Sequence, residues 1–168
     1  MIRVLSAVLT ASVCLFQPAL VTAALAEDHD DHSHHEGGMD GVRTVHAWAQ
    51  ATTGKSAFVF VDIENNSDRD IAITGGESEI AASVELVGFQ LKDGEPDYVV
   101  LPPVPIKAGT EMTLAPDGLA LRLNGLTTPL LQGAEHEIEI EFDFGHIEMF
   151  FQVEAADARH HSHVGHQH

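Results

Sequence analysis

Residues 135–144 read EHEIEIEFDF and, from residue 137 onward, alternate between acidic and apolar side chains. One face of this stretch carries Ile138, Ile140, Phe142 and Phe144, and the other carries Glu137, Glu139, Glu141 and Asp143. Successive side chains of a β-strand point to opposite faces of a sheet, so the pattern predicts a half-buried strand with an acidic outer face. Gly145 then turns the chain, and alternate apolar residues from 147 to 153 continue the buried face.

Strand patterns of the same kind extend toward the N-terminus. Residues 57–63 (AFVFVDI) are rich in strand-forming residues and end at a turn signal, NNSD, at residues 65–68. Further short strands are expected at residues 44–49, 70–74, 83–91, 111–114 and 119–123. Eight or nine short strands at this spacing, without a helical pattern of useful length, predict an all-β fold, an antiparallel β-sandwich.

The first 26 residues have the pattern of a signal peptide. Arg3 supplies a positive charge, residues 4–20 are mostly apolar, and Ala24-Leu25-Ala26 provides small residues before a cleavage site. The alternative is an uncleaved membrane anchor, which the shortness of the apolar stretch disfavours. Cleavage after Ala26 would remove Cys14, the single cysteine. No membrane span, disulfide, thiolate site or lipid-anchored cysteine is then expected in the exported chain.

Two segments of biased composition flank the predicted sandwich. Residues 27–41 read EDHDDHSHHEGGMDG, with four histidines and six acidic residues, and residues 159–168 read RHHSHVGHQH. Neither segment shows apolar periodicity, so neither can bury enough surface to fold alone. We therefore predict disordered tails at residues 27–41 and 156–168, with the sandwich at residues 42–155 between them.

The composition excludes several classes of function. A formal net charge of −18 disfavours nucleic acid and anionic membranes as partners, because phosphate binding requires clustered lysine and arginine. The same charge attracts cations. The sequence has no HExxH motif, no glycine-rich phosphate loop and no recognisable nucleophile–base spacing, so an enzyme is not expected.

Several segments of the sandwich region, in order along the chain, resemble a known family. These are AWAQAT at residues 47–52, FVDIENNSDRDIAITGGES at 60–78, AASVEL at 81–86 and IKAGTEMTLAPDGLALRLNGL at 106–126. They resemble the periplasmic copper chaperone family PCu(A)C. The resemblance implies a Greek-key, cupredoxin-like β-sandwich, a periplasmic location and copper as the bound metal.

The copper ligands that this resemblance implies are replaced in this chain. The copper ligands that the resemblance implies are one histidine after the VEL segment, a methionine some ten residues later and a final His-x-Met pair. Here those positions fall on Val87, on residues 98–100 and on Ala120-Leu121-Arg122. They are apolar, aromatic or cationic, so the core site of the family is expected to be absent.

The histidines of the two tails are the remaining candidates for metal binding. The predicted ligands are His29, His32, His34, His35, Met39, His160, His161, His163, His166 and His168. Imidazole binds Cu(II), Ni(II) and Zn(II), and copper binds most tightly in the usual divalent order. Zinc is the alternative, since histidine with carboxylates suits Zn(II). His46, His136 and the pair His146–Glu148 are interpreted as ordinary packed or surface residues.

These observations predict an exported metal-binding protein. Its function would be that of a periplasmic copper chaperone or copper buffer acting through the His-rich tails, with an envelope protein that receives copper as a possible partner. Two alternatives remain open at this point: a zinc-binding periplasmic protein, and a metal-free interaction module built on the same scaffold.

Overall fold

The computed structural model describes residues 35–161 as eleven strands and no α-helix, which confirms the all-β prediction. The strands are β1 (Glu36–Met39), β2 (Val42–Gln50), β3 (Ser56–Asn65), β4 (Ile71–Glu77), β5 (Ser83–Lys92), β6 (Glu95–Val100), β7 (Val104–Ile106), β8 (Thr110–Leu114), β9 (Leu119–Asn124), β10 (Glu135–Phe142) and β11 (Gly145–Glu154). The predicted signal peptide, residues 1–26, lies outside the described residues.

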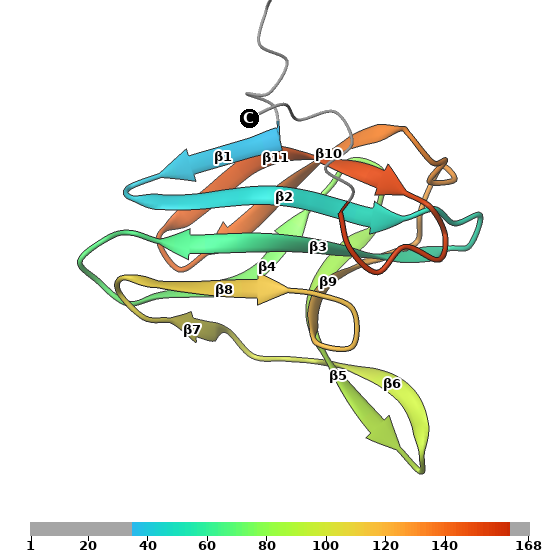
Figure 1. Cartoon of the computed structure of the whole chain (residues 1–168), viewed down its shortest axis with the longest axis horizontal. Coiled ribbons are helices and arrows are strands. Elements are labelled where there is room, and N and C mark those ends of the chain that lie inside the picture. The colour runs from blue at the N-terminus through green and yellow to red at the C-terminus, as the bar shows by residue number, and fades with distance from the viewer. Residues whose placement is uncertain (1–34, 162–168) are drawn as a thin grey trace, which may run out of the picture.

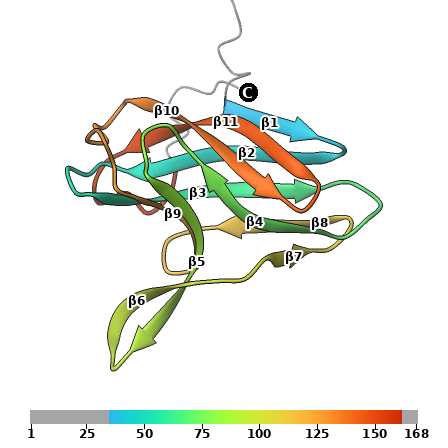
Figure 2. The same cartoon turned by 180° about the vertical axis from the view of Figure 1, so that it is seen from behind.

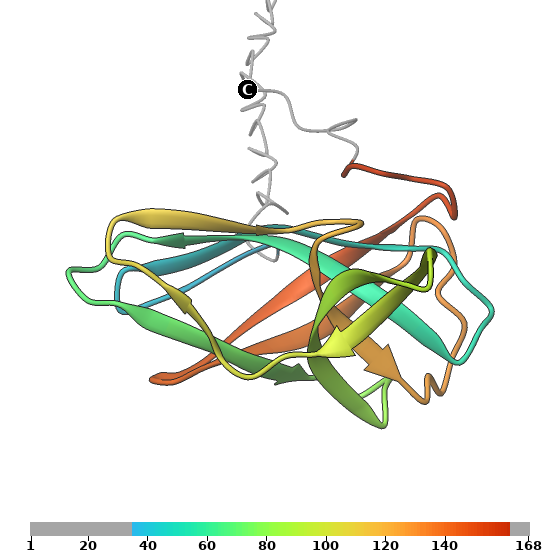
Figure 3. The same ribbon diagram turned by 90° about the horizontal axis from the view of Figure 1, so that it is seen from below.

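The strands form two layers. Their hydrogen-bonded order is β1-β2-β11-β10-β4-β5-β9-β3-β8, and an additional pairing of β2 with β3 closes the order into a ring. Figure 1 shows β1, β2, β3 and β8 on the near face, while the view from behind in Figure 2 shows β4 and β10 on the other. The view from below shows how flattened the body is (Figure 3). This arrangement confirms the predicted β-sandwich.

One pairing departs from the predicted antiparallel arrangement. β11 pairs with β2 in parallel, with Gln152 opposite Trp48 and Glu154 opposite Gln50. A parallel pair requires a long connection, and here nearly the whole domain lies between the two strands. Side-chain alternation reports which face of a strand is buried but not the direction of its neighbour, so the sequence pattern did not reveal this pairing.

The alternating stretch that begins at residue 135 behaves as predicted. Ile138, Ile140 and Phe142 of β10 are buried, as is Phe151 of β11. They belong to the main core between the layers. A second, smaller cluster contains Trp48, Phe60, Val87 and Ala120, with Phe58, Tyr98 and Ala158 packed against it. The rings of Trp48 and Phe60 have centroids 4.8 Å apart. Phe58 and Phe60 alternate along β3 with Val59 and Val61 of the main core, so this aromatic cluster lies on the opposite face of the strand.

The prediction of a disordered tail over residues 27–41 is wrong for residues 36–39, which form β1 and pair with β2. Asp40 and Gly41 connect the two strands with φ angles of 52° and 83°. Positive φ at both positions of a two-residue Asp-Gly loop is typical of a type I′ hairpin turn. Gly37 and Gly38 are poor strand formers, which explains why composition alone favoured a tail. Residues 27–34 lie outside the described part of the chain.

The described part of the C-terminal tail, residues 156–161, contains no strand. It turns back after β11 and crosses in front of β2 and β3 (Figure 1). Among the residues that the structure describes, no helix is long and apolar enough to span a membrane.

A pair of neighbouring substitutions on β10 tests the two faces of this strand. We expect Ile140→Ala to lower the free energy of unfolding by about 3 kcal/mol, because it removes a fully buried side chain. Glu141 lies partly exposed on the opposite face, so Glu141→Ala should change this free energy by less than about 0.5 kcal/mol. Urea denaturation of both variants would measure the difference, and equal losses would contradict the assignment of the two faces.

Candidate metal centre

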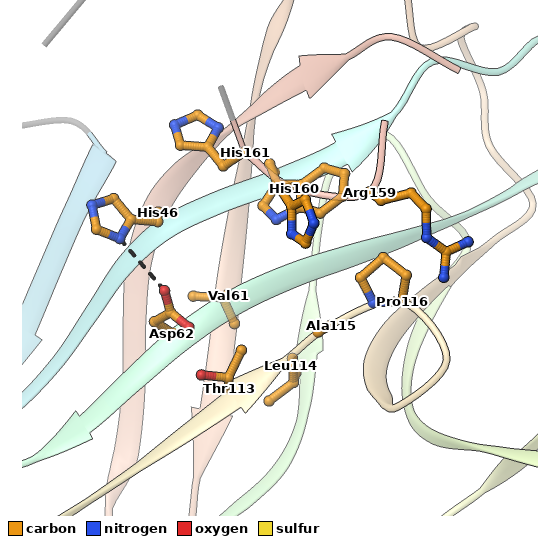
Figure 4. A pocket seen from close by; sticks show the side chains of 11 residues that line it. His46, Val61, Asp62, Thr113, Leu114, Ala115, Pro116, Arg159, His160 and His161 are labelled. Carbon is orange, nitrogen blue, oxygen red and sulfur yellow. Dashed lines mark ion pairs between the residues drawn. The ribbon is translucent and has the colours of Figure 1, made fainter. Parts of the chain in front are cut away.

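A cleft of about 170 Å³ opens on the near face of the sandwich, where the C-terminal segment crosses β2, β3 and the end of β8. Its polar lining consists of His46, Asp62, Thr113, Arg159, His160 and His161. Trp48, Val61, Leu114, Ala115 and Pro116 complete the wall. Figure 4 shows that the three histidines come from two parts of the chain, β2 and the C-terminal segment.

His46 reaches this cleft because β2 contains a β-bulge. Val45 pairs with Asp62 and Trp48 with Phe60, so His46 and Ala47 together lie opposite Val61 alone. His46 adopts a φ of 57°, in the left-handed region that residues other than glycine seldom occupy. The bulge lets Ala47 and Ala49 face the main core, while His46 stays half exposed and lines the cleft together with Trp48. Bulges of this kind commonly re-aim a side chain next to a functional site.

The C-terminal segment is fastened to the sandwich by several contacts. The side-chain amide of Gln50 donates a 2.8 Å hydrogen bond to the carbonyl oxygen of Ala158. Arg159 forms an ion pair with Asp117 in the turn after β8. Ala158 packs against the cluster around Trp48. These contacts hold His160 and His161 at the cleft.

Two imidazoles in or beside the cleft each have a carboxylate next to Nδ1. His161 Nδ1 lies 2.9 Å from Glu154 Oε1, and both side chains are nearly buried. His46 Nδ1 lies 3.5 Å from Asp62 Oδ2 (Figure 4). The ring centroids of His46 and His161 are 6.1 Å apart. A carboxylate at Nδ1 favours the tautomer whose lone pair is on Nε2, the atom that then binds a metal.

The structure separates the other predicted ligands from this cleft. His35 Nε2 lies 3.2 Å from Glu135 Oε1. Met39 is partly buried and packs against the main core. The predicted ligands outside the described residues are His29, His32, His34, His163, His166 and His168. Of the ligands predicted from sequence, the structure therefore brings together His160 and His161.

The sequence interpretation took His46 as an ordinary packed or surface histidine and did not anticipate its place beside the tail. A possible signal was the failure of alternation in VHAWA, where Val45, Ala47 and Trp48 are all buried. His136 fits the packing interpretation, because its ring lies against Phe151 and burial lowers its pKa.

A second group of possible ligands lies on the acidic outer face of β10 and β11. Glu139, His146 and Glu148 each present a ligand atom, and these atoms lie within 4.8 Å of one another. His146 Nε2 is 3.7 Å from Glu139 and 3.8 Å from Glu148. Glu139 and Glu148 are directly opposite each other on the two strands, so strand pairing itself sets this geometry.

Residues 42–153 match the protein family "Putative lipoprotein LpqE-like". The chain belongs to this family. A relative from Leifsonia xyli subsp. xyli, "Putative lipoprotein Lxx21020", is 30% identical over 107 residues, which span 63% of this chain and 64% of the relative. The chain thus covers less than two thirds of that relative's length.

The fold of this LpqE-like protein is that of solved PCuAC domains. The copper-bound PCuAC domain from PmoF2 gives a TM-score of 0.60 at 20% identity, covering 72% of this chain and 98% of that domain. The apo PCuAC domain from PmoF1 gives 0.61 at 22% identity, covering 72% and 99%. CuI-DR1885 from Deinococcus radiodurans gives 0.51 at 23% identity, covering 67% and 77%. These findings confirm the resemblance to PCu(A)C and the cupredoxin-like fold.

In this LpqE-like chain, the positions that the sequence resemblance assigns to copper ligands lie next to one another, and their side chains take part in apolar packing or in an ion pair. Val87 on β5 pairs with Val100 on β6 and with Ala120 on β9. Val87 and Ala120 are completely buried in the cluster around Trp48. Arg122 donates a 2.8 Å hydrogen bond to Glu85. None of these side chains, apolar or cationic, is a metal ligand.

The Arg122–Glu85 pair gives a pH-dependent prediction. Hydrogen bonds from Arg122 and Asn124 hold the pKa of Glu85 below its usual value. This stabilisation is present at neutral pH, persists down to the ordinary pKa of a glutamate, and disappears as the pH falls through the lowered pKa. We expect Glu85→Gln to reduce stability by up to about 1 kcal/mol at pH 7, because the pair is partly exposed. Thermal unfolding of both proteins at a series of decreasing pH values would check this, and a difference that did not shrink as the pH fell below the ordinary pKa of a glutamate would contradict it.

Proposed function

We propose that this protein is an exported copper-binding protein of the bacterial periplasm, a copper chaperone or copper buffer, that holds the ion with histidines of its tails. The observation that carries the proposal is the placement of His160 and His161, where the His-rich C-terminal segment is fastened over a cleft containing His46. The shared fold supports copper as the metal, since the solved neighbours include a copper-bound PCuAC domain and a Cu(I) form.

Replacement of the expected core ligands moves the proposed copper site from the core to the tails. Cu(I) favours sulfur ligands, whereas imidazole nitrogen and carboxylate oxygen suit divalent ions. The cleft is lined by three imidazoles and the carboxylate of Asp62, with no methionine. The proposed cargo is therefore Cu(II). The net charge of −18 supports the same role, because a negative field concentrates cations near the protein.

Export and location belong to the same proposal. Residues 1–26 have the signal-peptide pattern, and the family description refers to lipoproteins, which are envelope proteins. A lipid anchor on this chain would require Cys14, its single cysteine, which the proposed cleavage after Ala26 removes. An envelope protein that accepts copper is the proposed partner, and no catalytic activity is proposed.

Titration of the chain from residue 27 with Cu(II), Cu(I) and Zn(II) tests this function. A matched variant would carry Asn at the five C-terminal positions His160, His161, His163, His166 and His168, which leaves β1 and Ala158 in place. We expect the unmodified chain to bind Cu(II) at micromolar concentration or below and the variant to lose most of that binding. Calorimetry with analysis of bound metal measures both.

Two outcomes of this titration would contradict the proposal. Equal Cu(II) binding by the variant would place the site outside the C-terminal tail. Absence of binding in both proteins would favour the interaction module instead.

The β5–β6 hairpin would be the contact surface of such a module, because it projects from the body and exposes Leu91 and Val100 (Figure 1).

The group Glu139–His146–Glu148 favours zinc binding as a second candidate function. One imidazole with two carboxylates on paired strands is a donor set that suits Zn(II). We expect Glu148→Ala to weaken Zn(II) binding in copper-free buffer at least about tenfold, the loss that even an outer-shell change commonly causes. Glu111→Ala on β8 also removes one exposed carboxylate, so it is the matched control for net charge. Equal Zn(II) affinities of the two variants would contradict a site at this position.

A further inference from the structure

We infer that His46, His160 and His161 form one Cu(II) site shared between the folded domain and the C-terminal segment. The domain would supply the fixed ligand, His46, and the segment would supply the other two. This inference rests on the proposed function and deepens it by naming the ligands and the oxidation state of the ion. It adds His46, which neither the tail composition nor the family's ligand positions indicate.

The spacing of the rings suits one ion between them. A metal–nitrogen bond of about 2.0 Å places an imidazole centroid about 3 Å from the metal, so two coordinating rings have centroids up to about 6 Å apart. His46 and His161 are 6.1 Å apart. The ligand atoms of His46, His160 and His161 do not form a group within 4.8 Å of one another in the described structure, so binding of one ion requires these side chains to rotate toward it. His160 lines the same cleft and is the third nitrogen ligand.

The carboxylates beside the rings supply the outer shell of this site. Metal-binding histidines commonly direct their second nitrogen at a carboxylate, which fixes the tautomer and increases ligand basicity. Asp62 takes this position at His46 and Glu154 takes it at His161. Glu154 and His161 are nearly buried together, and Glu154 is one of the few polar residues in the buried part of the described domain. Burying a carboxylate is costly unless it is paired, so this pair is a built feature of the fold.

Backbone strain at His46 is the second, independent observation. A left-handed φ disfavours a residue with a Cβ, and such strain persists mainly where the surrounding structure or a function requires it. Asn or Gly would occupy this bulge position at lower cost. The histidine at this position therefore has a backbone cost, and its imidazole lies on this face of β2 beside the histidines of the C-terminal segment.

Because of this strain, a variant of His46 can be expected to gain stability while it loses Cu(II) affinity, a result that a folding defect would not produce. In the chain from residue 27, His46→Gly relieves the strain and should raise the midpoint of thermal unfolding without metal. The same substitution should lower the Cu(II) affinity of the first equivalent by about tenfold or more. Asp93→Gly is the matched control, because Asp93 has a φ of 55° in the β5–β6 turn and does not line the cleft. It should leave the Cu(II) affinity unchanged.

Two spectroscopic readouts locate the ion. Electron paramagnetic resonance of the chain with one equivalent of Cu(II) should show one nitrogen ligand fewer in His46→Gly than in the unmodified chain. In NMR spectra, paramagnetic Cu(II) should broaden the amides of residues 45–48 and 61–62 together with those of residues 160–161.

The inference is overturned if His46→Gly binds Cu(II) as tightly as the unmodified chain, or if broadening spares β2 and β3. In either case Cu(II) binding by the tails, and with it the proposed function, would stand. Failure of the unmodified chain to bind Cu(II) at all would remove both.

Discussion

The parallel pairing of β2 with β11 is the constraint on which the rest of the structure depends. It joins a strand near the start of the described domain to its last strand and places Glu154 opposite Gln50. Together with the β2–β3 pairing, it closes the ring of strands around the main core. It also decides where the chain leaves the sandwich, because the residues after Glu154 must emerge beside β2. The histidines at 160 and 161 therefore reach His46 as a consequence of strand order.

The second apolar cluster contains two of the positions that the resemblance to PCu(A)C assigns to copper ligands, Val87 and Ala120. Val87 and Ala120 are completely buried against Trp48 and Phe60, so this part of the sandwich is stabilised by apolar and aromatic packing. A buried histidine in place of Val87 would need a partner for its ring nitrogens, and an unsatisfied buried polar group costs about 1–3 kcal/mol. Val87 and Ala120 offer no side-chain nitrogen, oxygen or sulfur atom to a metal, which is why the proposed copper site uses histidines at the surface.

The parts of the fold that the sequence predicted are those governed by side-chain burial alone. The alternation at β10 and the apolar run at β3 predicted these two strands, because the burial of their side chains is visible in a short local pattern of residue types. β1 was missed because two glycines hide its pattern and an Asp-Gly turn pairs it locally with β2. The position of His46 was missed for a different reason. A β-bulge shifts the register by one residue, and its left-handed φ belongs to the backbone rather than to the pattern of side-chain types.

A ligand set divided between a strand and a chain terminus has a consequence for release of the ion. The C-terminal segment is held by the largely exposed Arg159–Asp117 ion pair, by the hydrogen bond from Gln50 to Ala158 and by the nearly buried pair of His161 with Glu154. Exposed ion pairs contribute about 0–1 kcal/mol, so most of the cost of moving the segment comes from separating His161 from Glu154. In the proposed site, departure of the segment would remove His160 and His161 together and leave His46 as the single imidazole ligand. A copper carrier of the proposed kind must release its ion to an acceptor, and this division of ligands would let movement of the C-terminal segment control that release.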